Sequence, residues 1–365
     1  MAHSKEARKT DWQPTTISQV AERAGVSKAT VSIVLNARPS PIKISETTRQ
    51  IVMKAAKELN YSPNRLARAF STSRSHVLGV IASSVHDLFS SDYSARLMKG
   101  ITHAANHSHY NIMIFDDEIM SNPDSTQSYV SLITSRNVDG IILISPDRLN
   151  PAMAQRAREL KEKGMPFVCV WRSPHSVKGT TIKVNNELGV RQATQYLLSL
   201  GHRRIAVITH GIRSQSSQER LQAFQKVLAD HHVPFCPEMV WHNEFHPADD
   251  HRIAEEILAL PNRPTAIFSF YDPVAVNVIN ILTNKGVRIP EEISVMGFGD
   301  VYTEVFARPE LTTVKESLVE IGQKAVSFLV DYLQKENSVL PEVEITIDPS
   351  LMIRASCGPA PPNSG

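Results

Sequence analysis

Seven short apolar runs between residues 77 and 298 constrain this chain most, because segments of helical length separate them. The runs are VLGVIA, NIMIF, GIILI, PFVCV, RIAVIT, TAIFSF and ISVMGF. Apolar strands that alternate with amphipathic helices are typical of parallel α/β sheets. Seven strands exceed one compact sheet of ordinary width, so we predict two similar lobes. The chain is expected to cross between them near Asn185 and Asn186 and again in the segment PELTTVK.

A ligand-binding cleft follows from this arrangement. In open parallel α/β folds, ligands bind beyond the carboxyl ends of the strands. The predicted cleft is therefore lined by the loops that follow residues 82, 115, 145, 171, 210, 270 and 298.

The stretch VAERAGVSKATVSIVLN, residues 20–36, has the spacing of a helix-turn-helix. Gly25 can take the left-handed turn between the helices, and Ser27 is placed to cap the second helix. One apolar stripe of the first helix contains Ile17, Val20, Ala21 and Ala24. In the second helix, Val31, Val34 and Leu35 face inward, whereas Lys28, Ala29, Ser32 and Ile33 share the opposite face. That outer face can contact base edges in a DNA major groove, although an ordinary helical hairpin has the same periodicity.

Charge is divided unevenly along the chain. Residues 1–74 carry a net charge of +8, and the remainder carries −6. Phosphate neutralisation supplies most non-specific DNA affinity, so the basic head favours a polyanionic partner. A solvated basic face is the alternative, but it leaves the coincidence with the helix-turn-helix unexplained.

Two more helices are predicted before the first strand. Ser45 can cap a helix through Ile51 and Leu59 that ends near Asn60. The segment SPNRLARAFST then allows about two helical turns, which are marginal in isolation. We expect DNA, a second copy of the chain, or both to stabilise this short helix. A simple linker is the alternative.

Several function classes lack support in the sequence. A polar N-terminus and the absence of a long apolar run predict a cytoplasmic protein without membrane segments. Cys169, Cys236 and Cys357 have unrelated spacings and indicate neither disulfides nor zinc. Asp116, Asp117 and Glu118, with His103, His107 and His109, read as solvated surface and not as a metal site. No catalytic motif is present, so we expect no enzyme activity and no cofactor.

The order of these parts resembles the lactose-repressor (LacI/GalR-type) family of bacterial transcription regulators. The resemblance covers nearly the whole chain and rests on several motifs together: TISQVAERAGVSKATVSIVLN, ISETTRQIVMKAAKELNYSPNRLARAF, LGVIASS, the helix of Gly100, VDGIILIS, GHRRIAVI, RLQAF, Asp272 before PVAV, VMGFGD and PELTTV. It implies a helix-turn-helix headpiece, a hinge helix and a two-lobed, periplasmic-binding-protein-like α/β domain with parallel sheets. It also implies a dimer on a pseudo-palindromic operator.

The resemblance assigns DNA-binding roles by position. Lys28, Ala29 and Ile33 fall where the family reads bases, and Ile33 stands where many members have arginine, so thymine is expected opposite it. Phe70 replaces the usual leucine wedge in the minor groove, with packing on the body domain as the alternative. The remaining expected DNA contacts are Thr16, Ser27, Thr30, Ser32, Asn36, Tyr61, Asn64, Arg65, Ala67 and Arg68.

The resemblance also places an effector in the cleft. Arg220 matches an arginine that meets effector oxygens, and the sugar-binding acidic or amide groups of many members are replaced by Trp171, Tyr271 and Gly299. We therefore expect an anionic or flat, aromatic effector, with a sugar-like one still open. Tyr93, Trp171, Phe270 and Tyr271 offer stacking surface, Arg172 a second cation, and Asp272 and Asp300 acceptors. Asp272 capping its helix, and a body that only dimerises, are the alternatives.

These inferences predict a dimeric DNA-binding regulator, most simply a repressor, controlled by a small-molecule effector. The C-terminal tail lacks the heptads of a four-chain bundle, which favours a dimer. A ligand sensor with a vestigial head and an enzyme fused to a DNA-binding module are the other classes. The expected divisions are a tail (1–15), the headpiece (16–61), the hinge and linker (62–74), an N-lobe (about 75–185 and 316–338), a C-lobe (about 186–315 and 339–354) and a flexible tail (355–365).

Overall fold

A computed structural model of the chain contains two compact units, residues 1–75 and 76–365. Each unit is described by itself. The structure describes residues 15–36, 43–61, 74–82, 88–89, 91–116, 138–144, 151–171, 177–211, 214–244, 246–300, 308–335 and 340–362.

The first unit is a three-helix head made of α1 (Ile17–Ala24), α2 (Lys28–Asn36) and α3 (Glu46–Glu58). The side chains of Thr16 and Gln19 form a capping box at the start of α1, and Gly25 ends α1 with φ +65°. Ser45 caps α3, and its Oγ accepts a hydrogen bond from the backbone N–H of Thr48. The core of this unit consists of Val20, Ala21, Val31, Val34, Val52, Ala55 and Ala56. The predicted helix-turn-helix is confirmed.

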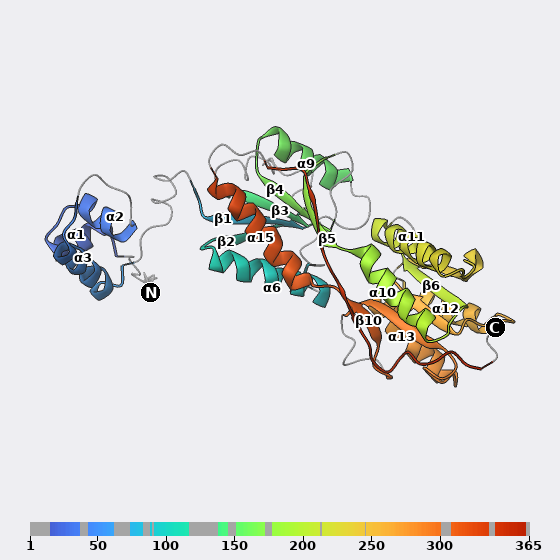
Figure 1. The fold of residues 1–365 in the computed structure, drawn as a ribbon. Coiled ribbons are helices and arrows are strands. Elements are labelled where there is room, and N and C mark those ends of the chain that lie inside the picture. The colour runs from blue at the N-terminus through green and yellow to red at the C-terminus, as the bar shows by residue number, and fades with distance from the viewer. Residues whose placement is uncertain are drawn as a thin grey trace, which may run out of the picture. The chain divides into compact units, whose positions relative to one another are not determined.

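The second unit contains two six-stranded sheets, which form two lobes (Figure 1). The strand order is β11-β5-β4-β3-β1-β2 in the first sheet and β12-β10-β9-β8-β6-β7 in the second. Every pairing is parallel except that of β12 with β10. The strands of the first lobe are β1 (Val77–Ala82), β2 (Asn111–Asp116), β3 (Gly140–Ile144), β4 (Phe167–Val170), β5 (Thr180–Val184) and β11 (Glu344–Ile347).

The second lobe repeats this plan. Its strands are β6 (Ile205–His210), β7 (Val240–Asn243), β8 (Ala266–Ser269), β9 (Ser294–Gly299), β10 (Thr312–Lys315) and β12 (Ser350–Met352). Its helices are α10 (Asn186–Ser199), α11 (Gln215–Asp230), α12 (Pro247–Ala259) and α13 (Asp272–Asn284), and the short 3-10 helix η2 (Pro237–Met239) precedes β7. All seven predicted strands are therefore present, and the predicted fold class is confirmed.

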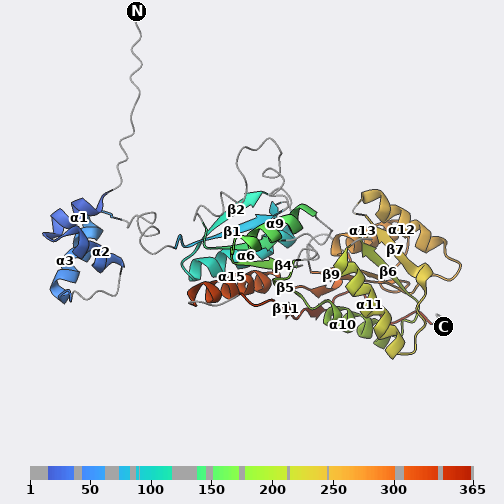
Figure 2. The same cartoon turned by 90° about the horizontal axis from the view of Figure 1, so that it is seen from above.

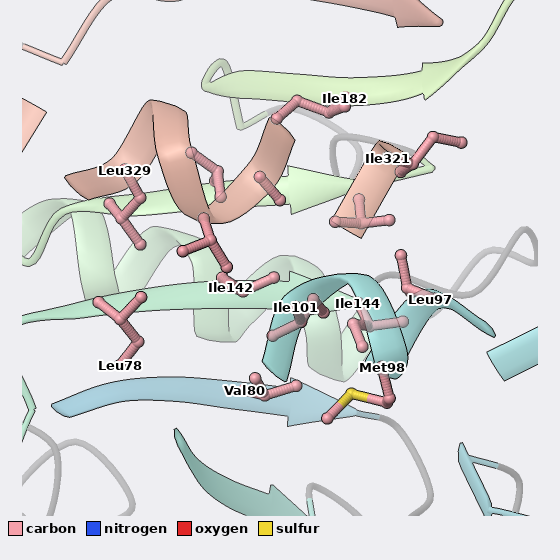
Figure 3. Close-up of a cluster of buried hydrophobic side chains, with 14 of the residues drawn as sticks. Leu78, Val80, Leu97, Met98, Ile101, Ile142, Ile144, Ile182, Ile321 and Leu329 are labelled. Atoms are coloured by element: carbon pink, nitrogen blue, oxygen red, sulfur yellow. The ribbon is translucent and has the colours of Figure 1, made fainter. Parts of the chain in front are cut away.

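Strand alternation distributes the core of the first lobe over two faces of its sheet. Helices α6 (Asp92–His107) and α15 (Leu318–Gln334) lie on one face and α9 (Pro151–Glu162) on the other (Figures 1 and 2). Leu78 and Val80 of β1 pack toward α6 and α15, whereas Ile81 packs toward α9. Figure 3 shows the first of these clusters, with Leu97, Met98 and Ile101 of α6 and Ile321 and Leu329 of α15.

The structure corrects two predicted boundaries. Residues 339–354 were expected in the C-lobe, but β11 pairs in parallel with β5 of the first sheet, with Ile345 opposite Ile182. The chain therefore crosses between the lobes a third time before β12. Residues 355–362 were expected in a flexible tail. Instead, Ser356 and Cys357 are buried, and the Ser356 hydroxyl donates to the carbonyl of Val295. A buried backbone needs such partners, so the tail packs on the second lobe.

No helix in the described part of the chain is long and apolar enough to cross a membrane.

Candidate functional site

The outer face of α2 is presented in the head as the periodicity predicts. Lys28 and Ala29 are exposed and Ile33 is half-buried, while Val31 and Val34 on the opposite side are buried. The Oγ of Ser27 accepts a hydrogen bond of 3.1 Å from the backbone N–H of Thr30 and so caps α2. An exposed first turn with short side chains is the kind of surface that a helix needs to read a major groove.

The other residues predicted to contact DNA are exposed, are half-buried in the head, or lie outside the described residues. Thr16 is exposed and belongs to the α1 capping box, Thr30 and Ser32 are half-buried on α2, and Tyr61 packs partly against the core of the head. The side chain of Asn36 and the hinge residues Asn64, Arg65, Ala67, Arg68 and Phe70 lie outside the described residues. Their roles stay predictions.

A cavity of about 300 Å³ lies between the two lobes, at the carboxyl ends of their strands. Both lobes contribute to its wall. Its lining includes Ser91, Tyr93, Ser94, Trp171, Lys183, Asn186, His210, Gln215, Ser216, Glu219, Arg220, Tyr271, Asp272, Phe298, Gly299 and Glu316. Tyr93, Trp171, Arg220, Tyr271 and Asp272 from the predicted effector set are thus brought together here.

Arg220 of α11 is the best-anchored side chain in this cleft. Its Nε donates to Oδ1 of Asn186 (2.8 Å), its Nη1 to the carbonyl of Phe270 (2.7 Å) and its Nη2 to Oε1 of Glu316 (2.6 Å). Its guanidinium carbon lies 3.6 Å from the ring centroid of Phe298. These contacts hold the guanidinium plane in one orientation before any ligand binds.

Glu316 links the two lobes through this cleft. It follows β10, where the chain passes from the second lobe into α15 of the first. One of its carboxylate oxygens accepts from Arg220, and the other accepts from the hydroxyl of Tyr93 at the start of α6. A ligand in the cleft therefore meets a polar network that belongs to both lobes.

A second ion-pair network crosses the cleft wall at Lys183. Its Nζ lies 3.2 Å from Oε1 of Glu219 on α11 and 3.1 Å from Oε1 of Glu344 on β11. Burial by itself would lower the pKa of Lys183, but the two carboxylates outweigh it, and the pKa is raised above its ordinary value of 10.5. Lys183 is therefore cationic, and its charge is already matched.

Two aromatic pairs supply the apolar surface of the cleft. The rings of Tyr93 and Trp171 lie 5.3 Å apart at a tilt, and those of His210 and Tyr271 stack at 5.3 Å. Trp171 has φ +72°, a backbone conformation that is strained for a bulky residue. Its indole Nε1 is buried and has no hydrogen-bond partner within the described residues. This geometry offers a stacking platform with an available donor.

Two of the predicted site residues, Phe270 and Asp300, do not line this cleft. Phe270 is fully buried in the second lobe and packs edge-to-face on Phe268, so only its carbonyl serves the site. Asp300 was expected as an acceptor for the effector, but its carboxylate accepts from Arg354 (2.6 Å). Arg172 lies outside the described residues.

Asp272 lies at the wall of the cleft and is tied to the second sheet. Its Oδ1 accepts from the hydroxyl of Thr313 on β10 (2.6 Å). The α13 helix begins at Asp272 itself, and no side-chain bond from the preceding Tyr271 caps it. Asp272 is therefore an acidic residue in the first turn of α13.

The expectation of an anionic effector rested on an arginine whose acidic neighbours had been replaced. In the structure, Glu316 pairs with Arg220, and Glu219 lines the same cleft. The sequence reasoning missed both, together with Lys183, Asn186 and His210. Glu316 directly follows the crossing segment PELTTVK, and Glu219 directly precedes Arg220, so position next to identified motifs was the available signal.

Of the residues considered for a metal, Asp117 and Glu118 lie outside the described residues. Within the described residues, no group of three or more His, Cys, Asp or Glu side chains is placed to hold a metal ion. His103 and His107 stack on the exposed side of α6 with centroids 4.2 Å apart.

Comparison with known families identifies both parts of the chain. Residues 16–64 match a family described as bacterial regulatory proteins, lacI family. Residues 194–357 match a periplasmic binding protein-like domain.

Similar proteins cover nearly the whole chain. It is 31% identical to the probable HTH-type transcriptional repressor ExuR of Bacillus subtilis (strain 168), over 92% of this chain and 98% of that protein. It is 27% identical to the HTH-type transcriptional repressor PurR of Mannheimia succiniciproducens, over 93% and 98% of the two chains.

Solved structures agree. The lac repressor dimer bound to operator and the anti-inducer ONPF has a TM-score of 0.75 at 25% identity, over 94% of this chain and 99% of that one. The complex of the transcriptional regulator CelR with cellobiose has a TM-score of 0.66 at 27% identity, over 94% and 99%.

Proposed function

This chain belongs to the lacI family of bacterial regulatory proteins, and we propose that it is a dimeric repressor whose operator affinity is set by a small molecule in the cleft between its lobes. The head supplies sequence recognition through α2. The cleft supplies control. The hinge segment, residues 62–74, connects the two and is expected to form the paired short helices on DNA.

The observation that carries the proposal is the network of Tyr93, Glu316 and Arg220, which joins the two lobes through the wall of the cleft. A ligand that contacts this network binds best in one relative arrangement of the lobes. Its differential affinity shifts the population toward that arrangement. Operator affinity then changes by the same coupling free energy, and DNA reciprocally changes ligand affinity.

The relatives support the DNA and dimer parts of the proposal. ExuR and PurR are named as HTH-type repressors, and the similar lac repressor structure is a dimer on operator with an anti-inducer bound. CelR was solved with cellobiose. By analogy, we propose that this chain binds double-stranded operator DNA as a homodimer and takes a small-molecule effector.

The test is selection of bound duplexes from a random library, with the wild-type protein and with Phe70→Ala. An enriched inverted repeat supports a symmetric operator reader, and a weakened or altered central step in the variant supports Phe70 as the minor-groove wedge. Arg65→Ala serves as the matched hinge control. It is expected to weaken binding uniformly and reduce the salt dependence, without changing the central step. Absence of any enriched repeat with the wild-type protein would leave two readings: a head that binds DNA only with a corepressor present, or a ligand sensor that has lost its DNA function. Only the second contradicts the proposed function.

A further inference from the structure

We propose that Glu316 is a specificity-determining residue that makes the cleft select uncharged effectors and reject anionic ones. This inference rests on the proposed function, because it names the class of effector for the same cleft. Its starting point is burial: in the ion pair of Arg220 with Glu316, the two side chains are 6% and 1% exposed. The guanidinium that an anionic ligand would need is already neutralised inside the protein.

A ligand carboxylate would have to displace Glu316 or lie beside it. Displacement leaves a buried carboxylate without its cation, and proximity places two like charges together in a poorly solvated cleft. Lys183 offers no substitute, since Glu219 and Glu344 already hold it. Among the described lining residues, Lys183 and Arg220 are the basic side chains apart from His210, and Glu219, Asp272 and Glu316 are the acidic ones. The electrostatics of the described lining oppose an anion.

The hydrogen-bonding capacity of the same pair fits a hydroxyl group. A guanidinium has five N–H donors, and Arg220 uses three of them on Asn186, Phe270 and Glu316. Its other two donors have no partner among the described residues, and they belong to the same guanidinium that binds the Glu316 carboxylate. A hydroxyl both donates and accepts, so it can satisfy both neighbours at once, whereas a carboxylate only accepts.

The aromatic pairs indicate the shape of the ligand. Trp171 with Tyr93 and Tyr271 with His210 offer aromatic surfaces, and the ring centroids within each pair lie 5.3 Å apart. The Nε1 of Trp171, which has no hydrogen-bond partner within the described residues, provides one more donor for a ligand oxygen or nitrogen acceptor. Together with Arg220 and Glu316, these groups fit an uncharged ring that carries neighbouring hydroxyls and can stack.

The experiment compares ligands that differ only in charge. D-galacturonate and D-glucuronate are titrated against their primary amides and the parent hexoses, by calorimetry on the full-length protein and on Glu316→Gln. We expect the wild-type protein to bind an amide or hexose at least about tenfold more tightly than the matching acid. In Glu316→Gln, which keeps the side-chain shape, this ratio is expected to fall by about tenfold or to reverse.

A control variant outside the cleft shows whether the change in ratio is specific to Glu316. Glu255→Gln removes an equivalent charge from an exposed pair with Lys285 outside the cleft, so the ratio should stay unchanged. Even if Glu316→Gln fails to fold, the ratio measured on the wild-type protein tests the predicted preference for uncharged ligands. A wild-type preference for the acids would overturn the proposal, and so would a failure of all six probes to bind.

Operator release with the same probes separates this inference from the proposed function. If the acids release the selected duplex and the uncharged probes do not, repression stands and the charge selection is wrong. If the uncharged probes bind with the expected preference but leave operator affinity unchanged, the selection stands and the proposed coupling is wrong.

Discussion

The guanidinium of Arg220 and the carboxylate of Glu316 form a buried ion pair with a separation of 2.6 Å between Nη2 and Oε1, although 96 residues separate them in sequence. The pair joins α11 of the second lobe to the segment that enters the first. Tyr93 extends the pair to α6. The position is central both for ligand recognition and for the relative arrangement of the lobes.

Arg220→Ala is expected to destabilise the protein by about 3–5 kcal/mol, because it leaves Glu316 as an uncompensated buried charge. The measurement is urea unfolding near neutral pH. Lys226→Ala, which breaks the exposed pair with Glu187, is the control and is expected to produce no measurable change. Equal stability of the two variants would show that the buried pair contributes nothing.

Gly100→Ala is expected to destabilise the first lobe, even though helix propensity alone favours alanine by about 1 kcal/mol. A Cβ on Gly100 of α6 would lie 2.0 Å from the carbonyl oxygen of Val319 on α15, and one on Gly322 would lie 2.4 Å from the carbonyl of Leu97. The helices cross at these glycines, and relief requires backbone movement, at a cost of about 1–3 kcal/mol. Thermal unfolding measures the effect. Lys99→Ala, at an exposed position of the same helix, should be close to neutral.

Ile33→Arg is expected to change the operator preference at one base pair in each half-site from thymine toward guanine. Isoleucine offers the thymine methyl an apolar contact, whereas arginine donates two hydrogen bonds to guanine. Duplex selection with the variant reads this directly. If the base preference changes only at other base pairs and stays the same at this one, Ile33 does not face this base.

Stability is expected to decrease as the pH falls below 6.5, through His202. Burial lowers the pKa of this histidine below its ordinary value of 6.5 despite its bond to the carbonyl of Gly358. Below pH 6.5, His202 of the unfolded chain binds a proton, whereas His202 of the folded chain binds it only at lower pH. The contribution of His202 to the free energy of unfolding is therefore fully present above pH 6.5 and is lost as the pH falls through the pKa of the folded state. His202→Asn should show a weaker pH dependence in thermal unfolding between about pH 7.5 and 5. If the variant shows an equally steep pH dependence, titratable groups other than His202 cause the loss of stability.

Alkylation should distinguish the three cysteines. Burial raises the pKa of Cys357 to about 12, so it supplies almost no reactive thiolate, and Cys169 is fully buried. Cys236 is half-buried. Iodoacetamide treatment of the native protein is expected to add one group, at Cys236, and treatment after unfolding to add three. Native modification of Cys357 would contradict the packed position of residues 355–362.

The sequence alone determined the elements whose signal is local. Gly25, Ser27 and Ser45 end or cap helices through contacts with residues a few positions away. The composition of the seven apolar runs indicates strands that are buried on both faces. Trp171 and Tyr271 could be placed in a cleft because they follow strands, and strand ends in parallel sheets share an edge. Arg220 lies within α11 and was placed there by the resemblance to the family. The short strands β5, β7, β10, β11 and β12 carry no such signal and were missed.

Only the tertiary structure decided which side chains meet in the cleft and with what net charge. Arg220 reads as an available cation in the sequence, but folding places Glu316 against it across 96 residues. The third crossing of the chain and the packing of residues 355–362 likewise depend on partners far along the chain, such as β5 and Val295. Periodicity and capping act within one element, whereas charge compensation and strand pairing depend on long-range contacts. The sequence therefore determined the architecture, and the fold determined the electrostatics of the site.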